Sequence, residues 1–213
     1  MRRLNLPKVY PITDRWLSGL PHAEQVARLV AGGARLVQLR EKRLPACAFY
    51  EEAVEAVRIA KARQARLIIN DRADLALAVG ADGVHLGQDD LPPEAARRLL
   101  GEEAIIGFST HNVEQAIAAA HLPIDYLAIG PIFPTSSKEN PDPVIGLDGL
   151  RRVCASVRKI RDLPIVAIGG ISEENARAVI EAGADAVAII SALIAEAEGI
   201  EARTRRLIGL LKG

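Results

Sequence analysis

Charged and small polar residues follow short apolar runs at seven points along this sequence. The segments concerned are VQLREK (37–42), LIIND (67–71), GVHLGQDD (83–90), GFSTH (107–111), AIGPIFPTSSK (128–138), AIGG (167–170) and AIIS (188–191). They contain the residue types that bind phosphate groups and divalent metal ions in proteins. If the runs are parallel strands, every cluster lies at the carboxyl end of a strand. All of them then face the common rim where a parallel α/β barrel has its active site.

Two of these segments end in carboxylates that could share a metal ion. Asp71 follows one apolar run, with Asn70 beside it, and Asp89 and Asp90 follow the next run. Mg²⁺ in proteins is held by one or two carboxylates together with waters and substrate phosphates. Asp71 with either Asp89 or Asp90 is therefore a candidate metal site, and Asn70 could donate to an anion next to it. In the alternative interpretation, these residues merely cap the helices that follow them.

Basic side chains in the segment QLREK (38–42) suit a phosphate-rich ligand. Side chains alternate along a strand, so Gln38 and Arg40 point to one side while Leu39 faces the helices. The planar guanidinium of Arg40 can bind two phosphate oxygens at once, whereas Lys42 supplies a mobile point charge. Taken alone, the segment is more typical of a charged surface run at the end of a strand.

Two further segments could bind a second phosphate group. TSSK (135–138) places three hydroxyl groups before a lysine, as a phosphate-binding loop does, although an ordinary polar loop has the same composition. Gly169 and Gly170, with Ser191 after the last apolar run, would expose backbone N–H groups. The loops after strands 7 and 8 form the usual phosphate site of α/β barrels. The pattern IVAIGGIS (165–172) followed by EAGADAVAIISA (181–192) favours that site over glycines kept only for packing.

Ser109 and two histidines complete the set of reactive side chains. Ser109 could bind a ligand heterocycle or a phosphate from the end of its strand. His111 has a pKa range suited to acid–base work, but it could equally orient a loop. His85 lies within an apolar run and is expected to be a packed or hydrogen-bonded barrel residue rather than a ligand.

About eight strands alternating with helices must position these residues. The apolar runs predict strands at 9–12, 36–39, 66–69, 83–86, 104–108, 126–129, 164–168 and 186–190. Helical patterns predict helices at 22–31, 46–64, 73–79, 93–100, 113–120, 149–157 and 173–182. Asn112 and Ser172 are expected to cap the helices that they precede. The sequence therefore predicts an α/β fold, a (β/α)8 TIM barrel that forms a single domain over residues 1–213, with a lid at 136–146.

A motif resembling Gly-Ala-Asp recurs where helices lead into strands, as in VGADGVHL (79–86) and AGADAVAI (182–189). Glycine is favoured just past a helix because it takes the left-handed conformation without a clash, and the Asp is expected to pin the joint. The recurrence suggests either an internal repeat of quarter-barrels or convergence of helix-to-strand joints on one solution. Both interpretations predict a parallel α/β fold.

The composition excludes several other classes of protein. Hydrophobic residues make up 49% and aromatic residues 3% of the chain, which fits parallel strands covered by helices. Lys and Arg together number 27, as do Asp and Glu, so no basic excess points to nucleic acid. No apolar run reaches the roughly 18 residues of a membrane span, and no signal peptide is recognisable. Cys47 and Cys154 lack metal-ligand spacing and are expected to be reduced in a cytoplasmic protein.

Taken together, these residues predict two anion sites at one rim. Backbone and hydroxyl groups after strands 7 and 8 would hold one phosphate. Arg40, Lys42, Lys138 and a metal ion on Asp71 and Asp90 would hold the other anion, and this much positive charge suits a diphosphate. The sequence thus predicts a transferase that joins a diphosphate ester to a phosphorylated acceptor. The metal and the basic side chains would stabilise the departing diphosphate.

The segments QLREK, NDRADLAL, GVHLGQDDL, GFSTH, GPIFPTSSK, AIGGI and ISA, in this order, resemble the motifs of the thiamine phosphate synthase family. The resemblance extends from Tyr10 to about Leu193. It implies a barrel enzyme that couples 4-amino-2-methyl-5-hydroxymethylpyrimidine diphosphate with 4-methyl-5-(2-hydroxyethyl)thiazole phosphate to give thiamine phosphate and diphosphate. In that family diphosphate leaves first and the thiazole nitrogen captures the pyrimidine-methyl cation, so no side-chain nucleophile is required.

Carried onto this sequence, the resemblance gives each matching residue a role. The pyrimidine diphosphate would be held by Gln38, Arg40, Lys42, Asn70, Ser109 and Lys138. The thiazole phosphate would be held by Thr135, Ser136, Ser137, Gly170, Ile190 and Ser191, and the cofactor Mg²⁺ by Asp71 and Asp90. The family commonly has Thr at the position of Ser137, which keeps the hydroxyl. The expected partners are the two small-molecule substrates, without nucleic acid or membrane, and the oligomeric state is open, a homodimer included.

Two other functions agree with part of this pattern. A thiazole tautomerase, an isomerase of a related barrel family, would bind the thiazole phosphate but would need neither Mg²⁺ nor a diphosphate site. A non-catalytic sensor of a phosphate ligand would gain little from two like-charged carboxylates placed together. The combination of Arg40, Lys42, Lys138 and the two aspartates favours the synthase.

Overall fold

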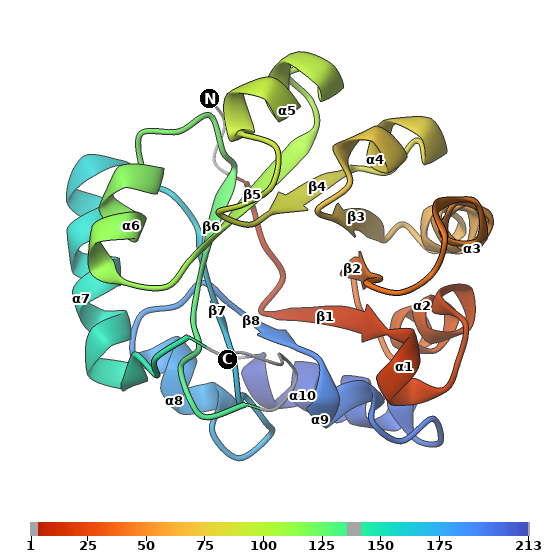
Figure 1. The fold of residues 1–213 in the computed structure, drawn as a ribbon. Helices are drawn as coiled ribbons and strands as arrows, with labels where there is room; N and C mark the ends of the chain where they lie inside the picture. Colours follow the sequence, from red (N-terminus) through yellow and green to blue (C-terminus); the bar gives the residue numbers. More distant parts are fainter. Residues whose placement is uncertain (1–3, 136–141, 213) are drawn as a thin grey trace.

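The described strands close into a parallel barrel in the order in which they follow one another along the chain (Figure 1). The computed structural model describes residues 4–135 and 142–212. Its strands are β1 (Val9–Asp14), β2 (Leu36–Arg40), β3 (Arg66–Asn70), β4 (Gly83–Leu86), β5 (Ile105–Thr110), β6 (Tyr126–Ile129), β7 (Ile165–Ile168) and β8 (Ala186–Ile189). β1 pairs with both β2 and β8, which closes the ring. The predicted (β/α)8 barrel is confirmed.

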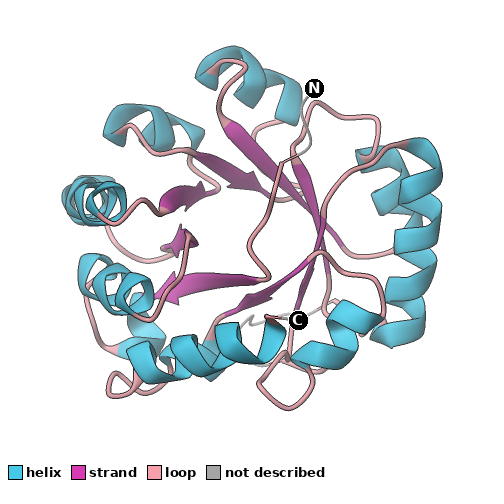
Figure 2. Ribbon diagram, turned by 180° about the vertical axis from the view of Figure 1, so that it is seen from behind, coloured by secondary structure: helices cyan, strands magenta, loops and turns pink. Residues whose placement is uncertain are grey.

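Helices surround the ring of strands on its outside (Figure 2). They are α1 (Arg15–Ser18), α2 (His22–Ala31), α3 (Ala46–Ala62), α4 (Ala73–Val79), α5 (Pro93–Leu100), α6 (Val113–Ala119), α7 (Gly146–Ile160), α8 (Ala176–Glu181), α9 (Ser191–Ile194) and α10 (Ile200–Leu211). Among the described residues, no helix is both long enough and apolar enough to cross a membrane. The short helices α1 and α9 start directly at the rim, after β1 and after β8.

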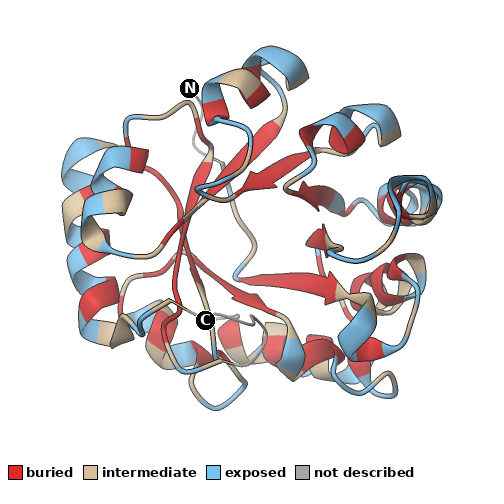
Figure 3. Cartoon of the chain, viewed as in Figure 1, coloured by how far each residue is buried: buried red, intermediate tan, exposed pale blue. Residues whose placement is uncertain are grey.

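The strands are buried on both faces, as their near-continuous apolar runs predict (Figure 3). On β2, Val37 and Leu39 belong to the layer between the strands and the helices. Leu36 belongs to a second, smaller cluster inside the barrel, which includes Tyr10 and Tyr126. The predicted alternation along this strand is therefore correct, and Gln38 and Arg40 share the inward side.

Aspartates fix alternate helix-to-strand joints. Asp82, Asp125 and Asp185 stand directly before β4, β6 and β8. Each accepts a backbone N–H from the preceding strand through a carboxylate oxygen, at distances of 2.7, 2.8 and 2.9 Å. The expectation that an Asp pins these joints is confirmed. At the joint before β2, where the sequence has Arg35, the guanidinium instead donates to the carbonyl of Arg63.

The predicted caps were right in one case and wrong in the other. Asn112 accepts the backbone N–H of Gln115 and begins α6. Ser172 does not cap α8, which begins three residues later than predicted and has Asn175 at its cap position. Asn175 instead accepts the backbone N–H of Ser172, so a turn occupies the segment that the pattern assigned to helix.

Candidate active site at the carboxyl rim

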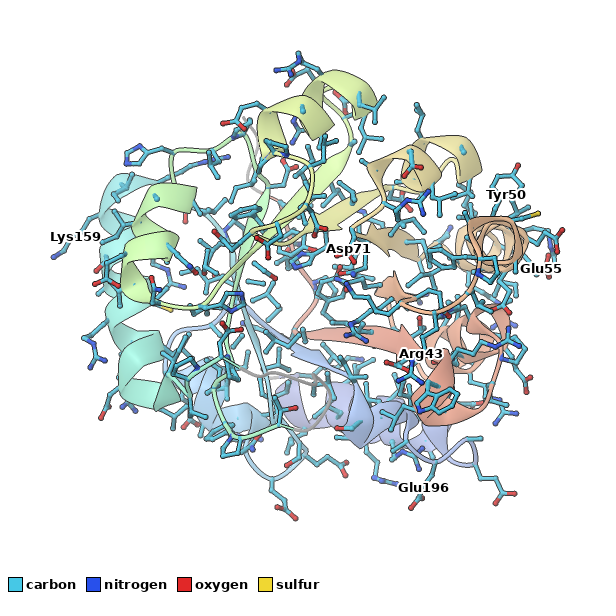
Figure 4. The ribbon with its side chains drawn as sticks, viewed as in Figure 1. Arg43, Tyr50, Glu55, Asp71, Lys159 and Glu196 are labelled. Carbon is cyan, nitrogen blue, oxygen red and sulfur yellow. The ribbon has the colours of Figure 1, made fainter. Side chains whose placement is uncertain are left out.

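The predicted site residues of β2, β3, β4 and β5 meet at the carboxyl end of the barrel. In the paired register, Asn70 lies opposite His85, and His85 lies opposite Gly107, two residues before Ser109. Figure 4 labels Asp71 at this end of the barrel, beside the tip of β3. Because adjacent parallel strands end at the same edge, side chains far apart in the sequence lie next to one another here.

Asp71 and Asp90 are direct neighbours at this rim. Asp71 has a left-handed backbone with φ of 62° and its N–H donates to the carbonyl of His85. Asp90 accepts the N–H of Gly87 at 2.7 Å. Burial raises the pKa of Asp90, and the hydrogen bond and the charge of Asp71 raise it further, against the lowering effects of the Gly87 amide and Lys42. Of the two aspartates that the sequence offers, Asp90 interacts with Asp71, whereas Asp89 is exposed. The role of Asp90 as a metal ligand stays a prediction.

The capping interpretation of these residues is wrong. The cap position of α4 is Arg72, and no side chain caps that helix. The cap position of α5 is Pro92, again without a side-chain bond. Asp71 and Asp90 are therefore not engaged by the helices that follow them.

Two carboxylates placed together fit a divalent cation. The described residues contain no group of three or more His, Cys, Asp or Glu side chains that could hold a metal ion. Any ion here would thus depend on the two aspartates, waters and substrate oxygens, which is the usual ligand set of Mg²⁺. In the structure, the ammonium of Lys42 forms an ion pair with Asp71 and offsets part of the repulsion.

Arg40 is held in place by a carboxylate that the sequence pattern missed. Its Nη1 donates to Oδ2 of Asp14 at 2.9 Å, and the two residues are register partners at the ends of β1 and β2. Asp14 also caps α1 by accepting the N–H of Leu17. The predicted strand ended at residue 12, two residues short of Asp14. A carboxylate directly after an apolar run was the signal that could have identified it.

The loop that carries Lys42 is fixed by a second set of buried groups. Glu41 accepts the backbone N–H groups of Arg43 and Leu44 through one oxygen. Its other oxygen is 3.0 Å from Nε2 of His22, a fully buried side chain whose Nδ1 is 2.7 Å from the Thr13 hydroxyl. These contacts orient the turn after β2.

Polar side chains also run through the apolar interior of the barrel. Gln38 donates from Nε2 to the Tyr10 hydroxyl at 3.1 Å, and the hydroxyls of Tyr10 and Tyr126 are 2.9 Å apart. His85 bonds to Tyr126 through Nδ1 at 2.9 Å and to the Ser109 hydroxyl through Nε2 at 2.8 Å. Burial lowers the pKa of His85 to about 4, so its ring is neutral at neutral pH. The prediction of a hydrogen-bonded barrel histidine is confirmed, although its contact with Ser109 was not foreseen.

The glycines after β7 are required by close backbone contacts. A Cβ atom on Gly169 would lie 2.6 Å from Cα of Pro131, and one on Gly170 would lie 2.5 Å from the carbonyl oxygen of Pro134. The N–H of Phe133 donates to the carbonyl of Gly169, so the loop after β6 rests on the loop after β7. This packing brings the chain leading to Thr135 next to Gly170. Ile190 and Ser191 begin the neighbouring helix α9.

The remaining predicted site residues lie at the end of β3 or follow β5 and β6 in the sequence. Asn70 is buried at the end of β3, and its side-chain role stays a prediction. His111 donates from Nδ1 to the carbonyl of Gly130 at 3.0 Å, and Oδ2 of Asp142 lies 3.4 Å from the same nitrogen, so His111 ties the loops after β5 and β6 together. Ser136, Ser137 and Lys138 lie outside the described residues. The same is true of most of the predicted lid.

Comparison with known proteins agrees with the motif pattern. Residues 9–193 match the family described as thiamine monophosphate synthase. A thiamine-phosphate synthase from Koribacter versatilis is 50% identical over 200 residues, which cover 91% of this chain and 92% of that protein. The structure of thiamine phosphate pyrophosphorylase from Pyrococcus furiosus matches with a TM-score of 0.86 and 38% identity over 98% of both chains. Another pyrophosphorylase structure, from Bacteroides thetaiotaomicron, has a TM-score of 0.68 at 18% identity and supports the fold alone. The resemblance inferred from the sequence is confirmed: this chain belongs to the thiamine monophosphate synthase family.

Proposed function

We propose that this rim joins the hydroxymethylpyrimidine diphosphate to the thiazole phosphate, with diphosphate as the leaving group and Mg²⁺ as the cofactor. The transfer of the activity rests on the family and on the similarity to thiamine-phosphate synthases along nearly the whole chain. The observation that carries the proposed mechanism is the pair of carboxylates on Asp71 and Asp90 beside the ammonium of Lys42. Arg40 lies at the end of the neighbouring strand β2.

The diphosphate end of the first substrate lies, in this proposal, between β2 and β4. Arg40 and Lys42 bind its oxygens, Asn70 donates to it, and Lys138 would add a further positive charge. Asp71 and Asp90 would hold Mg²⁺, which would supply positive charge for the diphosphate oxygens. The basic side chains favour departure because they stabilise the charge that grows on the leaving group.

The reaction breaks one bond and forms one. The bond from the pyrimidine methylene carbon to the diphosphate oxygen breaks, and its electron pair leaves with diphosphate. The lone pair of the thiazole nitrogen then forms the new bond to that carbon. Thr135, Ser136, Ser137, Gly170, Ile190 and Ser191 anchor the thiazole phosphate at the same rim, so the two reactants are held together.

A side-chain nucleophile has no part in this scheme. The Ser109–His85 contact has the geometry of a nucleophile and a base, with 2.8 Å between the atoms. However, burial lowers the pKa of His85 to about 4, which makes the ring a weak base. We therefore assign Ser109 to binding of the pyrimidine.

Mixing the two substrates with the enzyme and Mg²⁺ tests the function directly. Mass spectrometry should detect thiamine phosphate, and inorganic diphosphate should appear in equal amount. Conversion of a non-aromatic thiazole tautomer without any coupling would instead identify a tautomerase. Binding of thiazole phosphate without either reaction would identify a sensor.

A further inference from the structure

The polar side chains inside the barrel form one continuous chain that ends at the rim. It runs from Gln38 through Tyr10, Tyr126 and His85 to Ser109, and every link is between 2.8 and 3.1 Å. The first four members are buried and sit among apolar residues such as Ile12 and Val166. Ser109 is partly exposed, so this end of the chain opens onto the rim.

The number of available protons determines which group donates in each of these hydrogen bonds. The Gln38 nitrogen that faces Tyr10 can only donate. Among the described residues, the side-chain partners of the Tyr10 hydroxyl are Gln38 and Tyr126, so its single proton goes to Tyr126. The proton of Tyr126 then points to Nδ1 of His85. The reverse direction would leave the buried Tyr10 proton without an acceptor, which is costly.

The protonation states of the buried side chains agree with this direction of hydrogen bonding. Burial raises the pKa of both tyrosines, so each hydroxyl keeps its proton. If Nδ1 of His85 accepts from Tyr126, it carries no proton, and the single ring proton must lie on Nε2. Nε2 therefore donates to the oxygen of Ser109, and the proton of Ser109 is left for a ligand.

We propose that Tyr10 and Tyr126 are positioning residues for pyrimidine recognition, because they fix His85 in its Nε2–H tautomer and so make Ser109 a hydrogen-bond donor to the substrate. The matching group on the substrate is an acceptor, such as a ring nitrogen of the aminopyrimidine. The identity of this substrate rests on the proposed function, whereas the tautomer and the direction of the chain do not.

The tautomer can be measured without any substrate. In enzyme labelled with ¹⁵N-histidine, long-range proton–nitrogen correlation spectra at neutral pH should show His85 with its proton on Nε2 and a bare Nδ1. A proton on Nδ1, or a doubly protonated ring, would overturn the proposal. This result is decided on the wild-type enzyme and does not depend on whether the coupling reaction occurs.

A double-mutant cycle then tests whether Tyr10 acts through Ser109. Tyr10→Phe should raise KM for the pyrimidine diphosphate about twofold to tenfold, the effect of one lost hydrogen bond, with KM for thiazole phosphate unchanged. In a Ser109→Ala background the same change should have almost no further effect. Equal effects in both backgrounds, or a rise in both KM values, would contradict the proposal.

Tyr50→Phe is the matched control, because Tyr50 lies on the outer helix α3 and is 40% exposed. It should leave both KM values and the His85 spectrum unchanged. Thermal melts establish that each variant is folded. If wild-type enzyme shows the predicted tautomer but no coupling, the proposed function fails while the direction of the chain stands.

Discussion

Asp71 and Asp90 interact directly although they follow different strands, β3 and β4. Burial raises the pKa of Asp90, and the like charge of Asp71 raises it further. A cation between them removes both penalties. We therefore expect the two carboxylates together to bind a divalent ion more tightly than either would alone.

Replacing either aspartate should remove the dependence on Mg²⁺. Asp71→Asn keeps a residue that tolerates the left-handed backbone at this position, and Asp90→Asn keeps an acceptor for the Gly87 amide. We expect coupling to fall by a factor on the order of 100, with thiazole phosphate affinity nearly intact. Steady-state kinetics and calorimetry check the two parts.

Asp74→Asn is the control for charge, since Asp74 lies on α4 and pairs with Arg72 outside the candidate site. Its coupling rate should equal that of wild type. Undiminished Mg²⁺-dependent turnover in Asp71→Asn would show that the metal assignment is wrong.

Arg40 should matter for diphosphate far more than for monophosphate. Arg40→Ala removes the guanidinium that Asp14 holds at 2.9 Å, and Asp14→Asn loosens it while keeping the cap on α1. Calorimetry with inorganic diphosphate should show the larger loss for Arg40→Ala and a loss of about threefold to tenfold for Asp14→Asn. Equal losses for diphosphate and thiazole phosphate would count against two separate anion sites.

Gly170 should be intolerant of any side chain. Gly170→Ala places a methyl group 2.5 Å from the carbonyl oxygen of Pro134 at a left-handed φ of 63°. The loops after β6 and β7 must then separate, and affinity for thiazole phosphate should fall. Gly101→Ala is matched in having a positive φ, but nothing lies within 4 Å of its new methyl group. Gly101→Ala should lose about 1–3 kcal/mol of stability from backbone strain and keep its affinity. Gly170→Ala should lose stability from the clash as well as from strain, and it should also lose affinity for thiazole phosphate.

His85 should make the protein less stable in mild acid. Its pKa falls from 6.5 to about 4 on folding, so the unfolded chain binds a proton between these values while the folded protein does not. The free energy of unfolding therefore decreases as pH falls from 6.5 towards 4. Over this pH range, the free energy of unfolding of His85→Gln should fall by roughly 1–3 kcal/mol less than that of wild type, as measured by urea titrations. His121→Gln changes an exposed residue and should leave the pH dependence of the free energy of unfolding as in wild type. The same pH dependence in His85→Gln would refute the assignment to His85.

Much of this molecule could be predicted from the sequence because parallel strands are continuous apolar runs with polar residues at one end. The eight runs predicted the strands to within two residues, and the polar residues after them placed Arg40, Asp71 and the Asp89–Asp90 pair at the carboxyl rim. The alternation along β2 also placed Gln38 inside the barrel correctly.

What the sequence could not give depends on contacts across the barrel. Tyr10 and Tyr126 touch through their hydroxyls although 116 residues separate them, and each looks in the sequence like an ordinary core residue. The choice of Asp90 over Asp89 depends on the turn around Gly87, which no periodicity records. Ser172 looks like a helix cap, but the side chain of Asn175 folds back onto its backbone and delays the helix.

A crystal structure with Mn²⁺ in place of Mg²⁺ and with inorganic diphosphate tests the central claim most directly, since both ions prefer oxygen ligands in octahedral geometry. One anomalous peak is expected at about 2.0–2.3 Å from carboxylate oxygens of both Asp71 and Asp90 and from a diphosphate oxygen. The diphosphate should also contact Arg40. An ion bound elsewhere, or a diphosphate at the loops after β7 and β8 without any metal, would contradict it.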